Sequence, residues 1–324
     1  QVLAVMLACL GLWTLLDAPA LQRSAIASPL GTRRRVAVDT LSPISRVSAF
    51  LSLDRVGRAA DDLRGRHQSG DGHRALPAIG APVLFGPPSA PAVTKPAAPP
   101  VLLRAPTAAD PLRVLVVGDS LGLSFGQSFA AKLDASGVTK TTVDAREGTG
   151  LTRPDSFDWI AQFEADIVRF HPEVIVASFG GNDDQDVQVS GRYIGFGTTQ
   201  WRSIYHDRVA TIVAEAARAN ARLVWSGLPV MRSSAKTARL DTVMSVTRSA
   251  VDGHPLALWV PNSATLADSS GHYQVALPDG SGQQVIVREP DGVHETRAGA
   301  DRIAERTISA MVTAWHLQLK PRAV

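Results

Sequence analysis

The chain has 324 residues, 45% of them hydrophobic, and a formal net charge of +3 from 33 basic and 30 acidic residues. This balance, without a basic stripe carrying interleaved aromatic residues, excludes nucleic acid as an expected partner. The single cysteine, Cys9, excludes an intrachain disulfide and a cysteine-based metal site. The apolar content is sufficient for the core of one or two domains.

The N-terminal segment is almost wholly apolar from Val2 to Leu16. Residues 1–21 together approach the roughly 20 residues that span a bilayer. We therefore predict a transmembrane signal-anchor over 1–21, which makes the membrane a partner and leaves the rest of the chain extracytoplasmic. The alternative is a signal peptide cleaved near Ala18-Pro19-Ala20, which would give a secreted protein.

Two polar or proline-rich segments follow. Residues 22–75 are polar and rich in arginine, and we predict a juxtamembrane segment there. Residues 76–111 contain ten of the 21 prolines, which is typical of a semi-extended linker. The composition changes at Leu112, so we predict one folded domain over 112–318 and a C-terminal tail over 319–324.

Within this domain, short β-branched runs alternate with segments of helical apolar spacing. The predicted strands are 113–117, 141–145, 173–179, 222–226 and 257–260. The predicted helices are 124–135, 157–170, 201–220 and 296–316. Two further strands, 273–275 and 284–287, flank Gly- and Ser-rich residues 278–282, which indicates a hairpin. Strand–helix alternation predicts a parallel sheet covered on both faces, with ligands bound at the carboxyl ends of its strands.

The first motif, Gly118-Asp119-Ser120-Leu121, follows the first predicted strand directly. A serine in the turn that enters a helix exposes its hydroxyl group. Its own N–H lies at the helix N-terminus, where it can face developing negative charge. Ser120 is therefore a candidate nucleophile. The alternative is an ordinary helix N-cap, a common role for serine at such a junction.

The second motif, Asp291-Gly292-Val293-His294, precedes the last predicted helix. This spacing lets the Asp291 carboxylate reach Nδ1 of His294 and leaves Nε2 able to take a serine proton. The alternative is a simple Asp-Gly turn. The other histidines have no carboxylate or second histidine at a motif spacing, so we expect neither a metal nor a cofactor.

The third motif, Gly180-Gly181-Asn182-Asp183, follows the strand 173–179. Glycines there let the backbone approach a bound acyl group, and the Asn182 amide can donate to an oxyanion. The alternative is an Asn-Asp turn. The glycine-containing segment after the second predicted strand could supply a further N–H, for which Gly150 is our choice and Gly148 the alternative.

Residues 118–121, Gly150, 181–183 and 291–294 together resemble the four blocks of the SGNH/GDSL hydrolase superfamily. The resemblance covers about residues 112–316. It implies an α/β fold, a flavodoxin-like three-layer α/β/α sandwich with a five-stranded parallel sheet. It implies that Ser120 is the nucleophile, His294 the base and Asp291 the carboxylate that orients the base. It also implies an oxyanion hole formed by Ser120 N–H, Gly150 N–H and the Asn182 amide.

Residues 150–154, 157–159 and 228–232 are further similar to a bacterial cell-envelope subfamily of unknown substrate. The chain departs from the superfamily pattern at two positions. Glu295 stands where an apolar residue usually follows the histidine, and Thr149 stands where serine is common before the second glycine.

These features favour a serine esterase that hydrolyses acyl esters of an envelope glycan or lipid, acetyl esters being the plainest case. If a sugar hydroxyl replaces water as the acceptor, the same triad makes an O-acyltransferase. A non-catalytic glycan-binding module is the third interpretation. The presence of a nucleophile, a base and an oxyanion residue together argues against it.

Overall fold

The computed structural model of the protein describes residues 40, 43–44 and 103–319. The predicted membrane anchor over 1–21 lies wholly outside these residues, as does most of the sequence up to residue 102. Among the helices that the structure describes, none is both long enough and apolar enough to cross a membrane.

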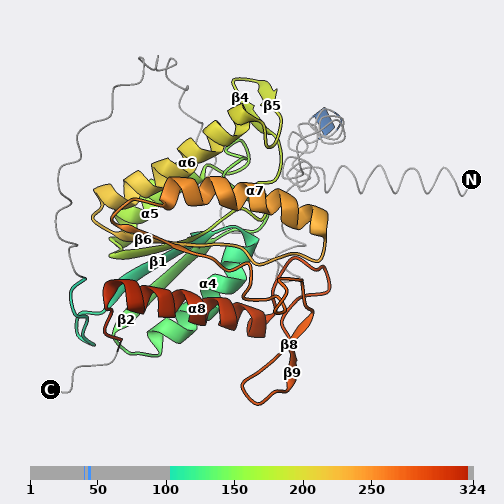
Figure 1. Ribbon diagram of the computed structural model, residues 1–324. Coiled ribbons are helices and arrows are strands. Elements are labelled where there is room, and N and C mark those ends of the chain that lie inside the picture. Colours follow the sequence, from blue (N-terminus) through green and yellow to red (C-terminus); the bar gives the residue numbers. More distant parts are fainter. Residues whose placement is uncertain (1–39, 41–42, 45–102, 320–324) are drawn as a thin grey trace, which may run out of the picture. The chain divides into compact units, whose positions relative to one another are not determined.

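A five-stranded parallel sheet forms the centre of the described domain (Figure 1). Its strands are β1 (Leu112–Gly118), β2 (Thr139–Ala145), β3 (Val174–Ser178), β6 (Arg222–Ser226) and β7 (Ala257–Val260). Their spatial order is β2-β1-β3-β6-β7, and every neighbouring pair is parallel. The carboxyl ends of the strands therefore share one edge. The order reverses between β1 and β3, which is where such sheets form a ligand crevice.

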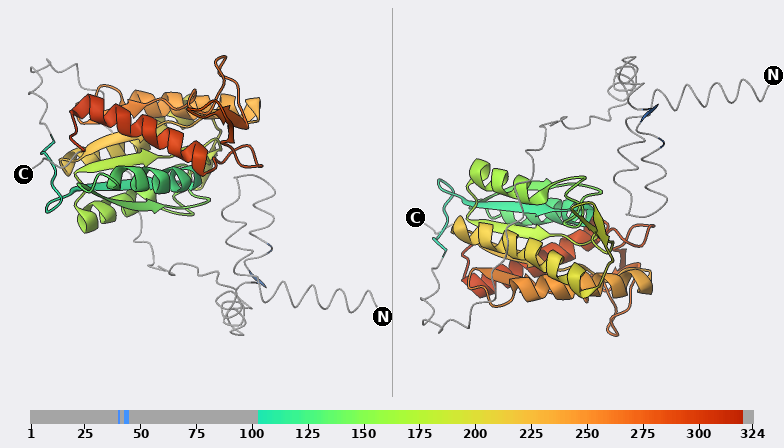
Figure 2. Two further views of the ribbon diagram at one scale, coloured as in Figure 1. Left: turned by 90° about the horizontal axis from the view of Figure 1, so that it is seen from below. Right: turned by 90° about the horizontal axis from the view of Figure 1, so that it is seen from above.

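Helices cover both faces of the sheet, so the described domain has three layers (Figures 1 and 2). The helices are α4 (Ser120–Asp134), α5 (Trp159–Phe170), α6 (Thr199–Arg218), α7 (Ser234–Val251) and α8 (Arg297–Trp315). α4 and α8 pack together on one face, while α5, α6 and α7 lie on the other.

The alternation of side chains along β1 divides the core between the two faces. Val114 and Val116 pack with Phe125 of α4 in the cluster under α4 and α8. Leu115 and Val117 belong to the second cluster, under α5, α6 and α7. Because β1 is buried on both faces, its sequence is a continuous apolar run rather than an alternating one.

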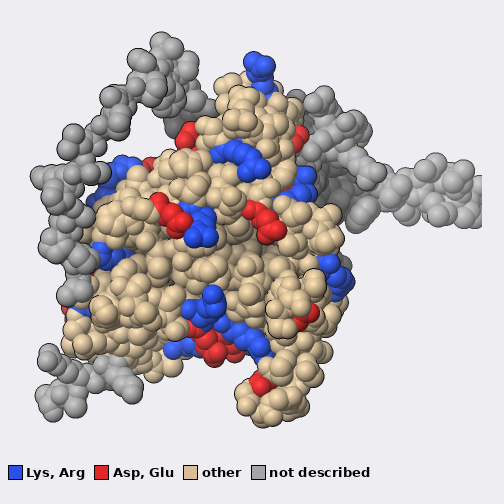
Figure 3. All heavy atoms as spheres, in the orientation of Figure 1, with Lys and Arg blue, Asp and Glu red and all other residues tan. Residues whose placement is uncertain are grey.

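Charged side chains of both signs are interspersed on the face shown in Figure 3. Ion pairs within or between helices include Lys132 with Glu305 at 2.7 Å, Arg297 with Asp301 at 3.0 Å and Arg248 with Asp252 at 2.9 Å. Such exposed pairs contribute little to stability, about 0–1 kcal/mol each.

The structure confirms the five predicted sheet strands, and their ends lie within two residues of the predicted ends. The predicted helix 124–135 begins four residues earlier, at Ser120, because Asp119 caps it. The predicted hairpin is present, but its strands are β8 (Ala276–Pro278) and β9 (Gln284–Ile286). Its turn lies where predicted, and the Asp279 carboxylate accepts from the N–H groups of two turn residues there.

Two elements are absent from the sequence prediction. One is the short hairpin of β4 (Val187–Val189) and β5 (Arg192–Ile194). The other is α7, whose buried face includes Thr247. The hydroxyl of Thr247 donates to Val243 O at 2.9 Å, so a polar residue interrupts the apolar stripe that would have indicated the helix.

The close approach of β1 to β3 generates a testable prediction. A Cβ on Gly118 would lie 2.4 Å from Ser178 O, whereas a Cβ on Gly280 would meet nothing within 4 Å. We expect Gly118→Ala to lower the free energy of unfolding by about 1–3 kcal/mol, because the backbone must move to admit the methyl group. Urea denaturation measures this, with Gly280→Ala as the matched control. Equal stabilities for the two variants would contradict the close approach.

Candidate active site

Ser120 lies at the carboxyl end of β1, as the first residue of α4. The side chain of the preceding residue, Asp119, accepts a hydrogen bond from Leu121 N at 3.0 Å and is the N-cap of the helix. The interpretation of Ser120 as an ordinary N-cap is therefore wrong. As the first helical residue, Ser120 also has an N–H without an acceptor inside the helix.

Ser120 lies near the start of the domain sequence and Asp291 and His294 lie near its end, and the fold brings the three side chains together. His294 Nε2 lies 2.9 Å from Ser120 Oγ, and His294 Nδ1 lies 2.6 Å from Asp291 Oδ2. With Nδ1 protonated, the imidazole donates to the carboxylate and accepts from the serine hydroxyl. This tautomer is the one that the hydrogen bond to Asp291 favours.

Asp291 holds the imidazole from within a turn. Its Oδ1 accepts from Val293 N at 2.8 Å and from His294 N at 3.0 Å. The alternative turn interpretation is thus also correct, since one carboxylate both makes the turn and contacts the ring. Desolvation opposes the charged form, but the bonds from the His294 ring and the two backbone N–H groups outweigh it and lower the pKa of Asp291 to about 2. Asp291 is therefore ionised at neutral pH.

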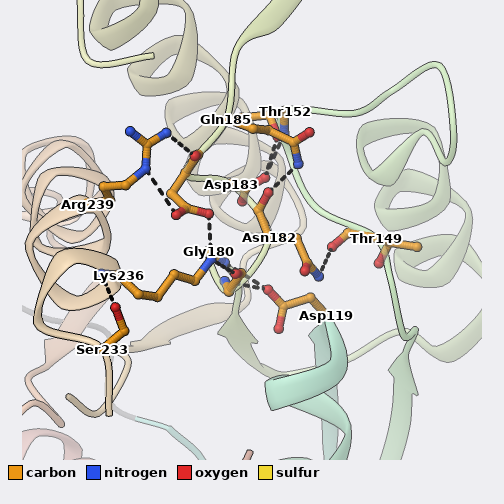
Figure 4. A network of polar contacts seen from close by, with 12 residues as sticks. Asp119, Thr149, Thr152, Gly180, Asn182, Asp183, Gln185, Ser233, Lys236 and Arg239 are labelled. Carbon is orange, nitrogen blue, oxygen red and sulfur yellow. Dashed lines mark hydrogen bonds and ion pairs between the residues drawn. The ribbon is translucent and has the colours of Figure 1, made fainter. Parts of the chain in front are cut away.

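The side chain of Asn182 points toward the loop that follows β2 (Figure 4). Its Nδ2 donates to Thr149 O at 2.8 Å, which fixes the orientation of the amide. Gly150 comes next in that loop, and a Cβ there would lie 2.4 Å from Asp183 Oδ1. Gly148 lies in the same turn with a φ of +69° and open space around it. Gly150, rather than Gly148, thus lies against the third motif.

Asp119 joins the first motif to the third through its buried carboxylate. Besides Leu121, it accepts from Gly180 N at 3.0 Å and from Gly181 N at 2.7 Å (Figure 4). Burial, followed by the nearby charge of Asp183, raises the pKa of Asp119 to about 7, against the three N–H donors. The role of this residue was not predicted from the sequence, although an acidic residue between a buried strand and a helix is itself a signal.

Asp183 ties the third motif to two other segments. Its Oδ1 accepts from Thr152 N at 2.8 Å and from Thr152 Oγ1 at 2.9 Å, and its Oδ2 accepts from Tyr205 OH at 2.9 Å. Burial raises the pKa of Asp183, and these donors counteract the shift. The loop after β2, the loop after β3 and α6 therefore meet at one carboxylate, a contact that the sequence did not reveal.

The N-terminal part of α7 supports the third motif from the other side (Figure 4). Lys236 Nζ donates to Gly181 O at 2.9 Å and to Asp184 Oδ1 at 2.5 Å. Arg239 reaches the same carboxylate, with its Nε 3.3 Å from Asp184 Oδ2. The segment around Asn182 is thus held by Asp119, which precedes α4, and by side chains from α6 and α7. Among the described residues, no group of three His, Cys, Asp or Glu side chains is arranged to hold a metal ion.

Three solved structures illustrate what the chain is similar to. LAE5, an alpha/beta hydrolase enzyme from the metagenome of Lake Arreo, Spain, is 16% identical, with a TM-score of 0.46 over 64% of this chain and 97% of that one. A catalytic mutant of Axe2, an acetylxylan esterase from Geobacillus stearothermophilus, is 14% identical, with a TM-score of 0.46 over 65% and 97%. A GDSL-like lipase from Bacteroides thetaiotaomicron VPI-5482 is 15% identical, with a TM-score of 0.43 over 62% and 88%.

No curated protein matches the chain at a significant level. The family model described as "Protein of unknown function (DUF459)" matches residues 113–310, which is more than half of the chain and includes Ser120, Asn182, Asp291 and His294. The chain therefore belongs to the DUF459 family.

Proposed function

We propose that the protein is a serine esterase of the SGNH/GDSL type. The observation that carries this proposal is the continuous hydrogen-bonded path from Ser120 Oγ through the His294 ring to Asp291, with distances of 2.9 and 2.6 Å. A hydroxyl, an imidazole and an ionised carboxylate in this order can move a proton off the hydroxyl as it attacks a carbonyl carbon.

In the proposed reaction, Ser120 Oγ attacks the ester carbonyl while its proton passes to His294 Nε2. The tetrahedral intermediate collapses, and His294 returns the proton to the leaving alcohol, so that an acyl group remains on Ser120. Water, deprotonated by His294, then releases the carboxylic acid and restores the serine. Asp291 stays ionised and stabilises the imidazolium that forms in each half of the cycle.

The proposed oxyanion hole consists of Ser120 N–H, Gly150 N–H and the Asn182 amide. An amide nitrogen carries two N–H donors, and the bond to Thr149 O uses one of them. The other can therefore donate to an oxyanion without the side chain moving. Donors held in place before the reaction stabilise the transition state most effectively, because they need no reorganisation.

The proposed substrate class is an acyl ester of a cell-envelope glycan or lipid, with acetyl esters as the simplest members. The support comes from the sequence, whose apolar segment over 1–21 and proline-rich segment over 76–111 suit a domain displayed outside the membrane. We accordingly propose a membrane-anchored, extracytoplasmic enzyme. Protease treatment of intact cells should digest the domain, and protection of the domain would contradict this placement.

Hydrolysis and acyl transfer differ only in the acceptor, and they are separated by product analysis. With an acetyl ester and an added oligosaccharide, the proposed esterase releases one acetate for each ester consumed. Transfer of the acetyl group to a sugar hydroxyl would instead identify the protein as an O-acyltransferase using the same triad.

Ser120→Ala provides the test of the nucleophile. Turnover of p-nitrophenyl acetate should fall by a factor on the order of 10⁶, because no other group can form the acyl intermediate. Circular dichroism should be unchanged, since the substitution removes only a hydroxyl. Near-normal turnover by the folded variant would contradict the proposal.

Asn182→Ala tests the oxyanion hole. We expect kcat to fall by roughly 10²–10³ with little change in KM, because the amide contributes mainly in the transition state. Steady-state kinetics on the same ester measure both constants. A rise in KM alone would place Asn182 in ground-state binding and outside the oxyanion hole.

A further inference from the structure

Residues 287–296, here called the histidine hairpin, carry the proposed base and its carboxylate. Two backbone hydrogen bonds close this segment: Thr296 N donates to Val287 O at 3.2 Å, and Glu289 N donates to His294 O at 2.8 Å. The position of the imidazole therefore depends on what holds the hairpin as a unit.

Arg288 and Glu295, which have opposite charges, form an isolated antiparallel β-bridge through their backbones at the base of the hairpin. Their exposed fractions are only 1% and 4%. Burying a charged side chain is costly unless it is paired or hydrogen-bonded, so the partners of these two residues matter for how the hairpin is fixed.

Glu295 connects the hairpin to the helix that begins with the nucleophile. Its Oε1 accepts a hydrogen bond from Ser124 Oγ at 2.8 Å, across 171 residues of sequence. Ser124 lies on α4 four residues after Ser120, which is one helical turn away on the same face. The base and the nucleophile are thus joined by a second path beside their direct contact.

The opposite side of the hairpin is fixed to the loop after β6. Arg288 donates to Val230 O, Arg232 N donates to Gly292 O at 3.0 Å, and Arg232 Nη2 donates to Pro290 O at 2.7 Å. These bonds hold the hairpin to the β6 loop, which does not carry Ser120. The distance from the imidazole to the serine therefore depends on the α4 side.

We propose that Glu295 is a positioning residue that acts through Ser124, holding the histidine hairpin so that His294 Nε2 stays within hydrogen-bond distance of Ser120 Oγ. This role rests on the esterase reaction proposed above. An apolar side chain at this position could not accept a hydrogen bond from Ser124.

The environment of Glu295 is consistent with this role. Burial raises the pKa of Glu295, while the bond from Ser124 and the positive charge of Arg288 favour its ionised form. The bond from Ser124 is the contact by which the Glu295 side chain is held to α4.

The test compares Ser124→Ala with Ser128→Ala. Ser128 lies one turn further along α4 and is fully buried, and its Oγ has no hydrogen-bond partner among the described residues. We expect Ser124→Ala to lower kcat about tenfold with an unchanged KM, because a displaced base costs rate and not binding. Ser128→Ala should retain the wild-type kcat. Both variants are assayed at a temperature where circular dichroism shows them folded.

A second experiment measures kcat for Glu295→Leu alone and for the double variant that also carries Ser124→Ala. If the two residues act through one bond, the double variant is no slower than Glu295→Leu, because the bond can be lost only once. Additive losses, or a Ser124→Ala enzyme as fast as Ser128→Ala, would overturn the inference. If Glu295→Leu does not fold, the pair of serine variants decides the matter. An active Ser120→Ala enzyme would instead overturn the esterase proposal itself, so the two failures are distinguishable.

Discussion

The carboxylate of Asp119 lies at the junction of the two loops that leave β1 and β3, where it accepts from the N–H groups of Leu121, Gly180 and Gly181. This arrangement starts α4 at Ser120 and at the same time fixes the backbone before Asn182. The parallel sheet supplies the condition for it, because β1 and β3 are neighbours and end at the same edge. The proposed nucleophile and oxyanion donor thus owe their proximity to the strand order and their precise placement to one buried side chain.

The two halves of the proposed site are held in different ways. The oxyanion half is surrounded by buried acceptors, Asp119 and Asp183, each of which gathers N–H and O–H donors from separate segments. The base half is a short hairpin fixed at its two sides, through Arg232 to the β6 loop and through Glu295 to α4. Donors that are fixed in place stabilise the negative charge of the transition state. The imidazole, in contrast, must exchange a proton with Ser120, which requires a constant distance between the two side chains.

The sequence predicted the sheet strands and the contact between Asp291 and His294 because both depend on local patterns. β1 and β3 are continuous apolar runs, and Asp291 and His294 are only three residues apart. α7 was not predicted because Thr247 interrupts its apolar stripe, and the start of α4 was misplaced because the capping role of Asp119 was not recognised. The contacts of Asp183 with Tyr205 and of Glu295 with Ser124 join segments that only the fold brings together. No residue spacing in the sequence indicates such contacts.

The central claim is that His294 activates Ser120 as a nucleophile, and the most direct measurement is covalent labelling by a fluorophosphonate followed by peptide mass spectrometry. The account predicts a single adduct on Ser120 that forms at least 10²-fold more slowly, as an order-of-magnitude estimate, when His294 is replaced by alanine. Labelling at another residue while Ser120 stays unmodified, or labelling of Ser120 at the same rate without His294, would contradict it.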